Sequence, residues 1–179
     1  MGEFAFKVVT LSGLPGTGTT TAARLVEAAT GYTYVNTGAI FRQMARERGV
    51  ALNEFGKRAA ADPSIDRELD ARQIALARKG GIVLEGRLSG YMVYSASVPA
   101  LKVLLETPLS VRVERVARRD QLSFPEAERL TLEREKDERS RYLGIYGFDL
   151  NRVDIYDVVL DSGKLSPDQI GQAILDRMR

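Results

Sequence analysis

The sequence of 179 residues contains neither cysteine nor histidine. Without cysteine the chain has no disulfide, no thiolate nucleophile and no cysteine-based metal site. Without histidine a Ser-His-Asp triad is excluded, and any general base must be a carboxylate. Any catalysis would therefore depend on carboxylates, hydroxyls, cationic side chains and backbone groups.

Long apolar runs are also missing. No stretch of 18 apolar residues occurs, so we expect no membrane-spanning helix, and residues 1–6 lack the basic start of a signal peptide. Gly2 suggests a myristoylation signal, but Phe6 stands where that signal has Ser or Thr. The formal net charge of +2 is too small to indicate binding of nucleic acid or a membrane surface. We expect a cytoplasmic monomer whose partners are small molecules.

The apolar pattern predicts one globular domain over residues 1–179, with an α/β fold. Its apolar content of 44% and charged content of 28% are ordinary for such a domain. We expect strands at residues 7–12, 32–36, 82–85, 101–106 and 158–161. Helical patterns occur at residues 19–30, 39–48, 53–62, 64–79, 108–120, 125–142 and 167–179. Alternating strands and helices predict a five-stranded parallel sheet with helices on both faces.

Two segments without strands interrupt this alternation. Residues 37–79 place several helices between the second and third strands, and residues 121–140 are highly charged. The remaining segments, residues 1–36, 80–120 and 141–179, would form the core. Both insertions would project from the carboxyl edge of the sheet, where open α/β sheets bind ligands. Two helical flaps beside one site suggest closure around a substrate.

A glycine-rich turn follows the first predicted strand and precedes a helix, as a phosphate-binding loop requires. Its backbone N–H groups can converge on an anion at the positive end of the helix dipole. The spacing is that of G-x-x-x-x-G-K-[ST], although a threonine replaces the lysine. An ordinary strand–turn–helix connection is the alternative, which three glycines and a proline within six residues disfavour. The candidate phosphate-binding residues are Gly13, Leu14, Pro15, Gly16, Thr17, Gly18, Thr19, Thr20 and Thr21, and the Thr20 hydroxyl would hold Mg²⁺.

Arginines follow the second and third predicted strands. Thr37 and Gly38 would cap a helix that carries Arg42 within its first two turns. Arg87 follows Gly86 at the end of the third strand. An isolated arginine is usually a solvated surface residue, but two at neighbouring strand ends beside a phosphate loop favour phosphate binding.

The helices at residues 108–120 and 125–142 carry further arginines. Arg115 and Arg119 lie on the first. Arg134, Glu138 and Arg141 have the spacing i, i+4, i+7 on the second, which places them on one helical face. The second helix is so rich in charge that ion pairs on a solvated surface are the alternative interpretation.

Together these segments resemble the cytidylate kinases, in the short form found mostly in archaea. The loop at residues 13–21 resembles that group's variant, in which Thr replaces the lysine. Residues 36–42, NTGAIFR, are similar to the family's D-S-G-x-[IL]-[FY]-R, with Asn36 in place of the acid. Residues 85–87, EGR, resemble its [DE]-G-R, and residues 133–141, EREKDERSR, resemble its lid stretch. Residues 160–166 resemble the turn beside the adenine.

The resemblance implies a P-loop nucleoside-monophosphate kinase that uses ATP and Mg²⁺ to phosphorylate CMP or dCMP. It implies that residues 37–79 bind the acceptor and residues 121–140 form a lid. Arg42 and Arg87 would hold the acceptor phosphate together with the helix start at Thr37 and Gly38. From the resemblance we expect Arg115 and Arg119 to contact ATP, Arg134 and Glu138 to contact the pentose or base, and Arg141 to contact the transferring phosphoryl group.

Two alternatives stay open on the sequence alone. The chain could phosphorylate another small acceptor, such as AMP, UMP or shikimate, because spacing does not reveal the contacts that choose the base. It could also be a non-catalytic nucleotide-binding regulator, which the missing lysine favours. A regulator has no use for the acceptor-side and lid arginines, so we favour the kinase. Its predicted catalytic residues are Thr20, Arg119, Arg134 and Arg141, with the arginines compensating for the missing lysine.

Overall fold

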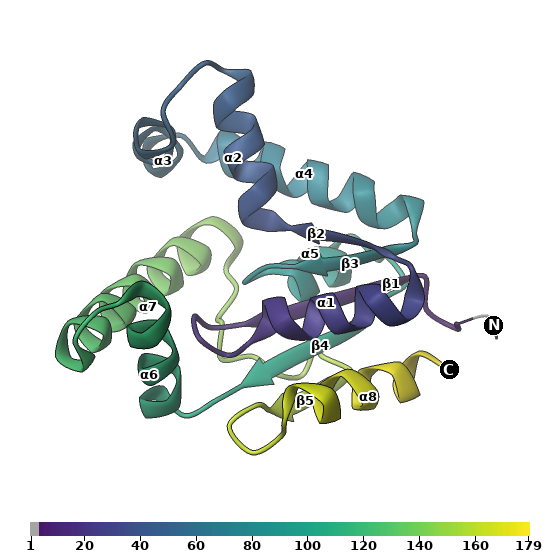
Figure 1. Cartoon of the computed structure of the whole chain (residues 1–179). Coiled ribbons are helices and arrows are strands. Elements are labelled where there is room, and N and C mark those ends of the chain that lie inside the picture. Colours follow the sequence, from purple (N-terminus) through teal and green to yellow (C-terminus); the bar gives the residue numbers. More distant parts are fainter. Residues whose placement is uncertain (1–3) are drawn as a thin grey trace.

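The computed structural model describes residues 4–179 as a parallel sheet with helices on both faces (Figure 1). The strands are β1 (Val8–Gly13), β2 (Thr33–Asn36), β3 (Ile82–Glu85), β4 (Leu101–Glu106) and β5 (Val158–Asp161). The helices are α1 (Thr19–Thr30), α2 (Thr37–Glu47), α3 (Leu52–Ala61), α4 (Pro63–Lys79), α5 (Ser89–Ser95), α6 (Leu109–Asp120), α7 (Phe124–Tyr146) and α8 (Pro167–Met178). The predicted five-stranded fold is confirmed.

The strand order is β2-β3-β1-β4-β5, and every neighbouring pair is parallel. β1 therefore lies in the middle of the sheet, and the loop that follows it opens at the centre of the carboxyl edge. The register aligns Leu11 of β1 with Glu85 of β3, and Glu85 with Asn36 of β2. The ends of these three strands consequently present their residues at one level.

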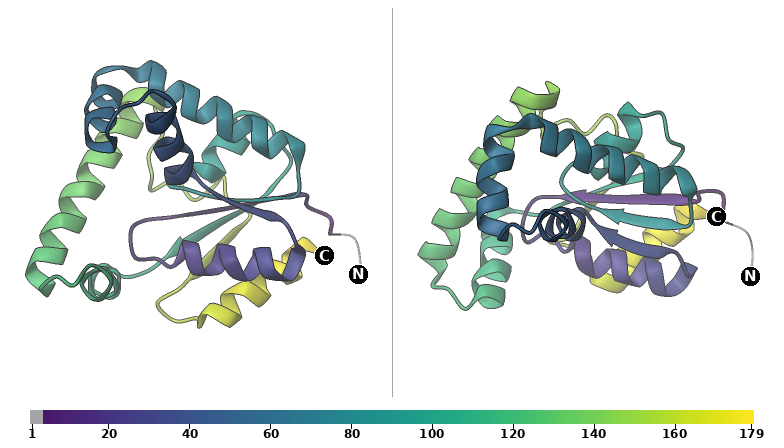
Figure 2. Two further views of the ribbon diagram at one scale, coloured as in Figure 1. Left: turned by 45° about the horizontal axis from the view of Figure 1, so that its top comes forward. Right: turned by 90° about the horizontal axis from the view of Figure 1, so that it is seen from above.

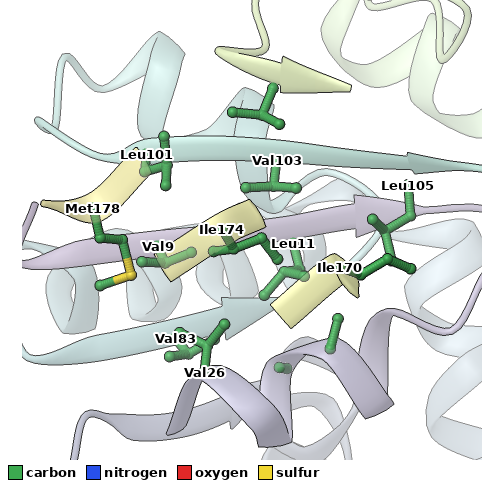
Figure 3. Packing of buried hydrophobic residues seen from close by; sticks show 13 residues of the cluster. Val9, Leu11, Val26, Val83, Leu101, Val103, Leu105, Ile170, Ile174 and Met178 are labelled. Atoms are coloured by element: carbon green, nitrogen blue, oxygen red, sulfur yellow. The ribbon is translucent and has the colours of Figure 1, made fainter. Parts of the chain in front are cut away.

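The main core lies between the sheet and the helix pair α1 and α8 (Figure 3). Val9 and Leu11 of β1 point to this face and pack with Val26 of α1 and Ile174 of α8, and all four are fully buried. Helices α4 and α5 cover the opposite face, where the Ser12 hydroxyl lies 3.1 Å from that of Ser89. Alternation along β1 thus serves both layers, as a parallel sheet covered on both faces requires.

The segments predicted to be insertions are helical. Helices α2, α3 and α4 account for residues 37–79, and α3 and α7 both lie beyond the carboxyl ends of the strands (Figure 1). A separate small core holds the first insertion together, in which Met44 of α2 and Phe55 of α3 are fully buried. Within residues 4–179, no helix is both long and apolar enough to cross a membrane.

The structure corrects three local predictions. Helix α5 has no counterpart in the sequence analysis, because seven residues are too few for a helical period to stand out. Helix α7 continues past the predicted end at residue 142, and past the lid boundary at residue 140, to Tyr146; it ends at Gly147, whose φ is 62°. Helix α2 is capped by Asn36, whose side chain accepts from the Ala39 N–H, rather than by Thr37 and Gly38.

One core side chain generates a stability prediction. Thr10 of β1 is fully buried, and within residues 4–179 its hydroxyl has no hydrogen-bond partner. An unpaired buried hydroxyl costs about 1–3 kcal/mol. We expect Thr10→Val to raise the free energy of unfolding by about 1 kcal/mol and the Tm by about 2–4 °C, measured by thermal and urea denaturation.

The matched control is Thr30→Val. The Thr30 hydroxyl, also buried, donates to the Val26 carbonyl at 2.7 Å and accepts from the Tyr32 N–H at 3.1 Å. Its removal should lower stability by about 1 kcal/mol. A Thr10→Val protein as stable as the parent, or less stable, would contradict the assignment.

Candidate active site

The turn after β1 is shaped for an anion. Gly16 and Gly18 have φ of 85° and 87°, which glycine adopts without strain. A Cβ on Gly16 would lie 2.6 Å from the Arg112 carbonyl oxygen, so the loop also needs glycine for close packing. Helix α1 begins directly after Gly18, with no side-chain cap and no acidic residue in its first turn. Its first N–H groups and the positive end of its dipole are therefore left for a ligand.

The carboxylate of Glu85 is a centre of hydrogen bonding beside this loop. It accepts from the hydroxyls of Thr19 at 2.6 Å and Thr20 at 2.8 Å, from the Asn36 amide at 2.8 Å, and from the Tyr34 hydroxyl. Burial opposes its ionisation, yet these hydrogen bonds hold its pKa below the usual value. The Asn36 amide donates here, which an acid at position 36 would do only when protonated.

Threonine in the lysine position thus has a definite partner. The Thr19 side chain is directed at Glu85, and its hydroxyl hydrogen is given to that carboxylate. From the sequence, Thr19 is expected to bind phosphate. In this structure its backbone can still serve that role, while its side chain serves Glu85.

The two predicted acceptor arginines lie at the same cavity but differ in their contacts. Arg87 donates through Nε to Glu138 at 2.9 Å and through Nη1 to the Gly13 carbonyl at 2.9 Å. Arg42 is exposed, and within residues 4–179 it makes no ion pair. Thr37 lies beside them, with its hydroxyl 3.0 Å from the Glu85 carbonyl oxygen. A Cβ on Gly86 would lie 2.2 Å from that hydroxyl, so glycine is required there.

The remaining predicted arginines are distributed along α6 and α7. Arg115 donates to the Gly16 carbonyl at 3.1 Å and to the Ser162 carbonyl at 2.7 Å. Arg119 is exposed and pairs with Asp120 at 2.7 Å. Arg134 pairs with Glu138 at 2.8 Å, so Glu138 receives both Arg134 and Arg87.

One arginine that the sequence analysis does not select is buried at the loop. Arg112 pairs with Glu135 of α7 and lies with Nη1 3.4 Å from the Pro15 carbonyl. The sequence does contain a signal for its burial, because Arg112 falls in the apolar stripe formed by Leu109, Val113 and Val116. A charged residue in such a stripe indicates a buried ion pair.

Helix α7 also reaches the first insertion. Arg141 pairs with Asp66 of α4, whose side chain is only 6% exposed, and the Tyr146 hydroxyl donates to Asp70. Burial raises the pKa of Asp70 to about 6 and that of Tyr142 to about 12. No charge pattern in the sequence indicated that Asp66 is buried and Asp70 partly buried at contacts with α7.

A cavity of about 650 Å³ joins these elements. Its lining includes nearly every predicted site residue, namely Leu14, Pro15, Gly16, Gly18, Thr19, Thr20, Thr21, Thr37, Gly38, Arg42, Arg87, Arg115, Arg119, Arg134, Glu138 and Arg141. The lining also includes residues that were not predicted as site residues, among them Phe41, Asp66, Leu69, Asp70, Gln73, Glu85, Tyr142 and Tyr146. Gly13 contacts it indirectly, through Arg87. Thr17 instead lines a smaller neighbouring cavity of about 190 Å³.

Comparison with solved structures agrees with this fold. A protein of unassigned function from Eubacterium ventriosum aligns with a TM-score of 0.71 at 15% identity, covering 96% of this chain and 97% of that one. Shikimate kinase from Acinetobacter baumannii aligns with a TM-score of 0.62 at 15% identity, covering 96% of this chain and 92% of that one. At such identities the likeness concerns the fold alone.

Comparison of sequences is more specific. The chain is 49% identical over 163 residues to the cytidylate kinase of Pyrococcus furiosus, covering 91% of this chain and 83% of that protein. It is 45% identical over 169 residues to the cytidylate kinase of Methanopyrus kandleri, covering 90% and 88%. The family model described as the cytidylate kinase-like family matches residues 8–164, which include the loop, both insertions and the turn after β5. This match over most of the chain, together with identities of 49% and 45% to the two relatives, shows that the chain belongs to the cytidylate kinase-like family.

Proposed function

We propose that the chain transfers the γ-phosphoryl group of ATP to CMP or dCMP, producing ADP and CDP or dCDP. The carrying observation is the cavity of about 650 Å³ that unites the loop after β1, the guanidinium groups of Arg42 and Arg87, and α7. The proposed donor and acceptor sites would share this one space, which a nucleotide-binding regulator would not require. The names of the similar archaeal proteins support the choice of CMP.

The donor side is formed by the loop and α6. Backbone N–H groups of the loop and the start of α1 would hold the ATP phosphates. Arg115 bridges the loop and the turn at Ser162, through the Gly16 carbonyl and the Ser162 carbonyl. The smaller cavity on that side, lined by Leu165, Pro167 and others, suits the adenine.

The acceptor side is formed by the ends of β2 and β3. Among residues 4–179, Arg42 makes no ion pair, so its guanidinium group is available to bind an anion. Arg87 makes its two hydrogen bonds through Nε and Nη1, which leaves Nη2 available. Both would hold the monophosphate, with the helix start at Thr37 and Gly38 beside them. Residues 37–79 would thus form the acceptor-binding insertion. The lid would comprise the α6–α7 turn and α7.

The residues present fit a magnesium ion held mainly by phosphates and water. The Thr20 hydroxyl lines the cavity and gives its hydrogen to Glu85, which leaves its lone pairs for a cation. Within residues 4–179 no three acidic groups cluster to form an all-protein site. Mg²⁺ commonly keeps several waters and one or two protein ligands. When bound, it would neutralise charge that develops on the phosphoryl oxygens.

This chain's residues act by positioning and by charge. The acceptor is a phosphate that is already ionised, so a chain without histidine needs no strong general base. Arg42 and Arg87 would align the attacking oxygen with the γ-phosphorus, and the loop N–H groups would hold the leaving phosphate. The helical insertions would exclude water from the cavity and so prevent hydrolysis of ATP.

Arg42 generates the first functional prediction. Arg42→Ala should weaken CMP binding about tenfold or more, since a charge-assisted phosphate contact contributes roughly 1.5–3 kcal/mol. ATP binding should change little. Calorimetry with each ligand measures both. Arg46→Ala is the control, because Arg46 is exposed on the same helix and does not line the cavity. Equal weakening of CMP and ATP in Arg42→Ala would place this arginine outside the acceptor site.

The second functional prediction concerns Thr20. Thr20→Ala should lower kcat on the order of a hundredfold, about 2.7 kcal/mol, and shift the Mg²⁺ concentration needed for half-maximal activity upward. The Tm should fall by only about 3–6 °C, because one hydrogen bond to Glu85, contributing roughly 1.5 kcal/mol, is lost and three other donors remain. Magnesium titration of activity and thermal melting test this. Unchanged turnover and unchanged magnesium dependence would mean that another group holds the ion.

The third functional prediction concerns the positive charge that replaces the missing lysine. Arg119 lines the cavity, and its contact with Asp120 is a surface ion pair of a kind that contributes little to stability. Arg119→Ala should lower kcat about a hundredfold, about 2.7 kcal/mol, with an unchanged Tm. The control is Arg118→Ala, which removes an exposed arginine paired with Glu114 outside the cavity. If instead Thr19→Ala abolishes turnover and Arg119→Ala does not, the threonine itself replaces the lysine.

A further inference from the structure

Helix α7 runs along the cavity and contacts different groups near its two ends. Its Glu135 meets Arg112 at the loop, its Glu138 meets Arg87 at the end of β3, and its Arg141 meets Asp66 of α4. At 1.5 Å per residue, Arg141 lies about 9 Å further along the helix than Glu135. The two ends of the cavity therefore differ: one holds the phosphate-binding groups, and the other is formed by α4 and the last turns of α7. In Figure 2 (left) the end of α7 approaches the α2–α4 insertion.

The α4 end is built like a pocket for a flat polar ring. Phe41 and Leu69 are partly buried apolar side chains of the cavity wall, and Tyr142 of α7 also lines the cavity. Apolar and aromatic walls bind the faces of a base, while a few polar groups read its edge. A monophosphate held by Arg42 and Arg87 would direct its base, the part farthest from the phosphate, toward this end.

Two polar groups at this end have hydrogen-bonding capacity to spare. Arg141 engages Asp66 through Nε and Nη2, and within residues 4–179 its Nη1 makes no hydrogen bond. Asp70 accepts from Tyr146 through Oδ2, whereas its Oδ1 has only the Gln73 amide at 3.5 Å. No cation within residues 4–179 forms an ion pair with Asp70. The pocket thus offers one acceptor and one donor side by side.

We infer that Asp70 accepts a hydrogen bond from the N4 amino group of the acceptor's cytosine, while Arg141 donates to its N3 or O2. This inference rests on the proposed function and names the residues that select the base. Asp66 is a positioning residue that holds Arg141 in place. It also replaces the predicted role of Arg141: the arginine meets the base, not the transferring phosphoryl group.

The same pair rejects uracil. Cytosine presents an N4 donor and an N3 acceptor, and a carboxylate is a suitable partner for the N4 amino group. Uracil presents an O4 acceptor, which would face the Asp70 carboxylate, and an N3 donor, which would face the Arg141 guanidinium. Uracil would therefore place an acceptor against an acceptor and a donor against a donor. A site whose buried polar groups are left unpaired discriminates strongly against the wrong ligand.

The charged form of Asp70 costs stability, so the fold alone does not favour a carboxylate at this position. Burial disfavours its charged form and raises its pKa to about 6, a shift that the Tyr146 hydroxyl and the Arg141 charge offset only in part. An asparagine could accept the same hydrogen bond from Tyr146 without the penalty of a buried charge. Local features that cost stability concentrate at functional sites. Asp70→Asn should accordingly remain folded at neutral pH.

The test compares kcat/KM for CMP and UMP in the parent and in Asp70→Asn. We expect the CMP-to-UMP ratio to fall by tenfold or more, with the loss for CMP mainly in KM, because the asparagine amide can donate to uracil O4. The parent should also discriminate against the CMP analogue in which hydrogen replaces the N4 amino group, and Asp70→Asn should not. An unchanged ratio in Asp70→Asn would overturn the inference.

Tyr146→Phe is the matched control. It removes the same α4–α7 hydrogen bond but leaves the Asp70 carboxylate in place. We expect it to retain the preference for CMP; if it loses the preference as fully as Asp70→Asn does, the effect comes from helix docking and the inference is wrong. Calorimetry with CMP and UMP separates this inference from the proposed function. A parent that binds CMP without turnover refutes the kinase, while the binding ratio in Asp70→Asn still decides the role of Asp70.

Discussion

The buried carboxylate of Glu85 is the constraint on which the arrangement of the loop and the strand ends depends. It lies at the end of β3, directly opposite Asn36 in the sheet register, with no ion-pair partner within residues 4–179. A buried carboxylate without partners costs several kcal/mol, and each hydrogen bond to a charged group returns roughly 1.5–3 kcal/mol. The hydroxyls of Thr19, Thr20 and Tyr34 and the Asn36 amide supply these bonds. The threonine in the lysine position and the asparagine in the acid position thus both stabilise the same buried carboxylate.

Positive charge reaches the loop from outside it. Arg87, Arg112 and Arg115 contact the carbonyl oxygens of Gly13, Pro15 and Gly16, respectively. In a trans peptide the carbonyl and the following N–H point in opposite directions. Holding the carbonyls of residues 13 and 15 therefore turns the N–H groups of the next residues, Leu14 and Gly16, away from the arginines; both residues line the cavity. The guanidinium groups fix the loop and also bring positive charge close to it.

The sequence was informative wherever a short motif has one physical meaning. All five strands, the family and the loop were predicted, because apolar runs and glycine spacing are local signals. The roles of single site residues stay predictions. Asp66 and Asp70 could not be found, since their burial depends on where α7 lies, and a charged helix resembles a solvated one until its partner is known. The continuation of α7 past Gly144 was missed because glycine disfavours a helix. Tyr142 and Tyr146, on either side of this glycine, pack against Phe148 and its neighbours.

Helix α7 combines two kinds of contact that respond differently to ligands. Near its start, Ala127 is fully buried against Val113 and Val116 of α6, and near its end Tyr142 and Tyr146 join an apolar cluster with Phe148. Such apolar contacts have no competitor among nucleotide phosphates. Between them, the helix is held by contacts such as Arg87 with Glu138, in which a phosphate oxygen can replace the carboxylate because both are anionic acceptors. We therefore expect the ends of α7 to stay in place if a substrate phosphate replaces Glu138 at Arg87. If α7 serves as the proposed lid, these replaceable ionic contacts would let substrate enter without first displacing the helix from the cavity.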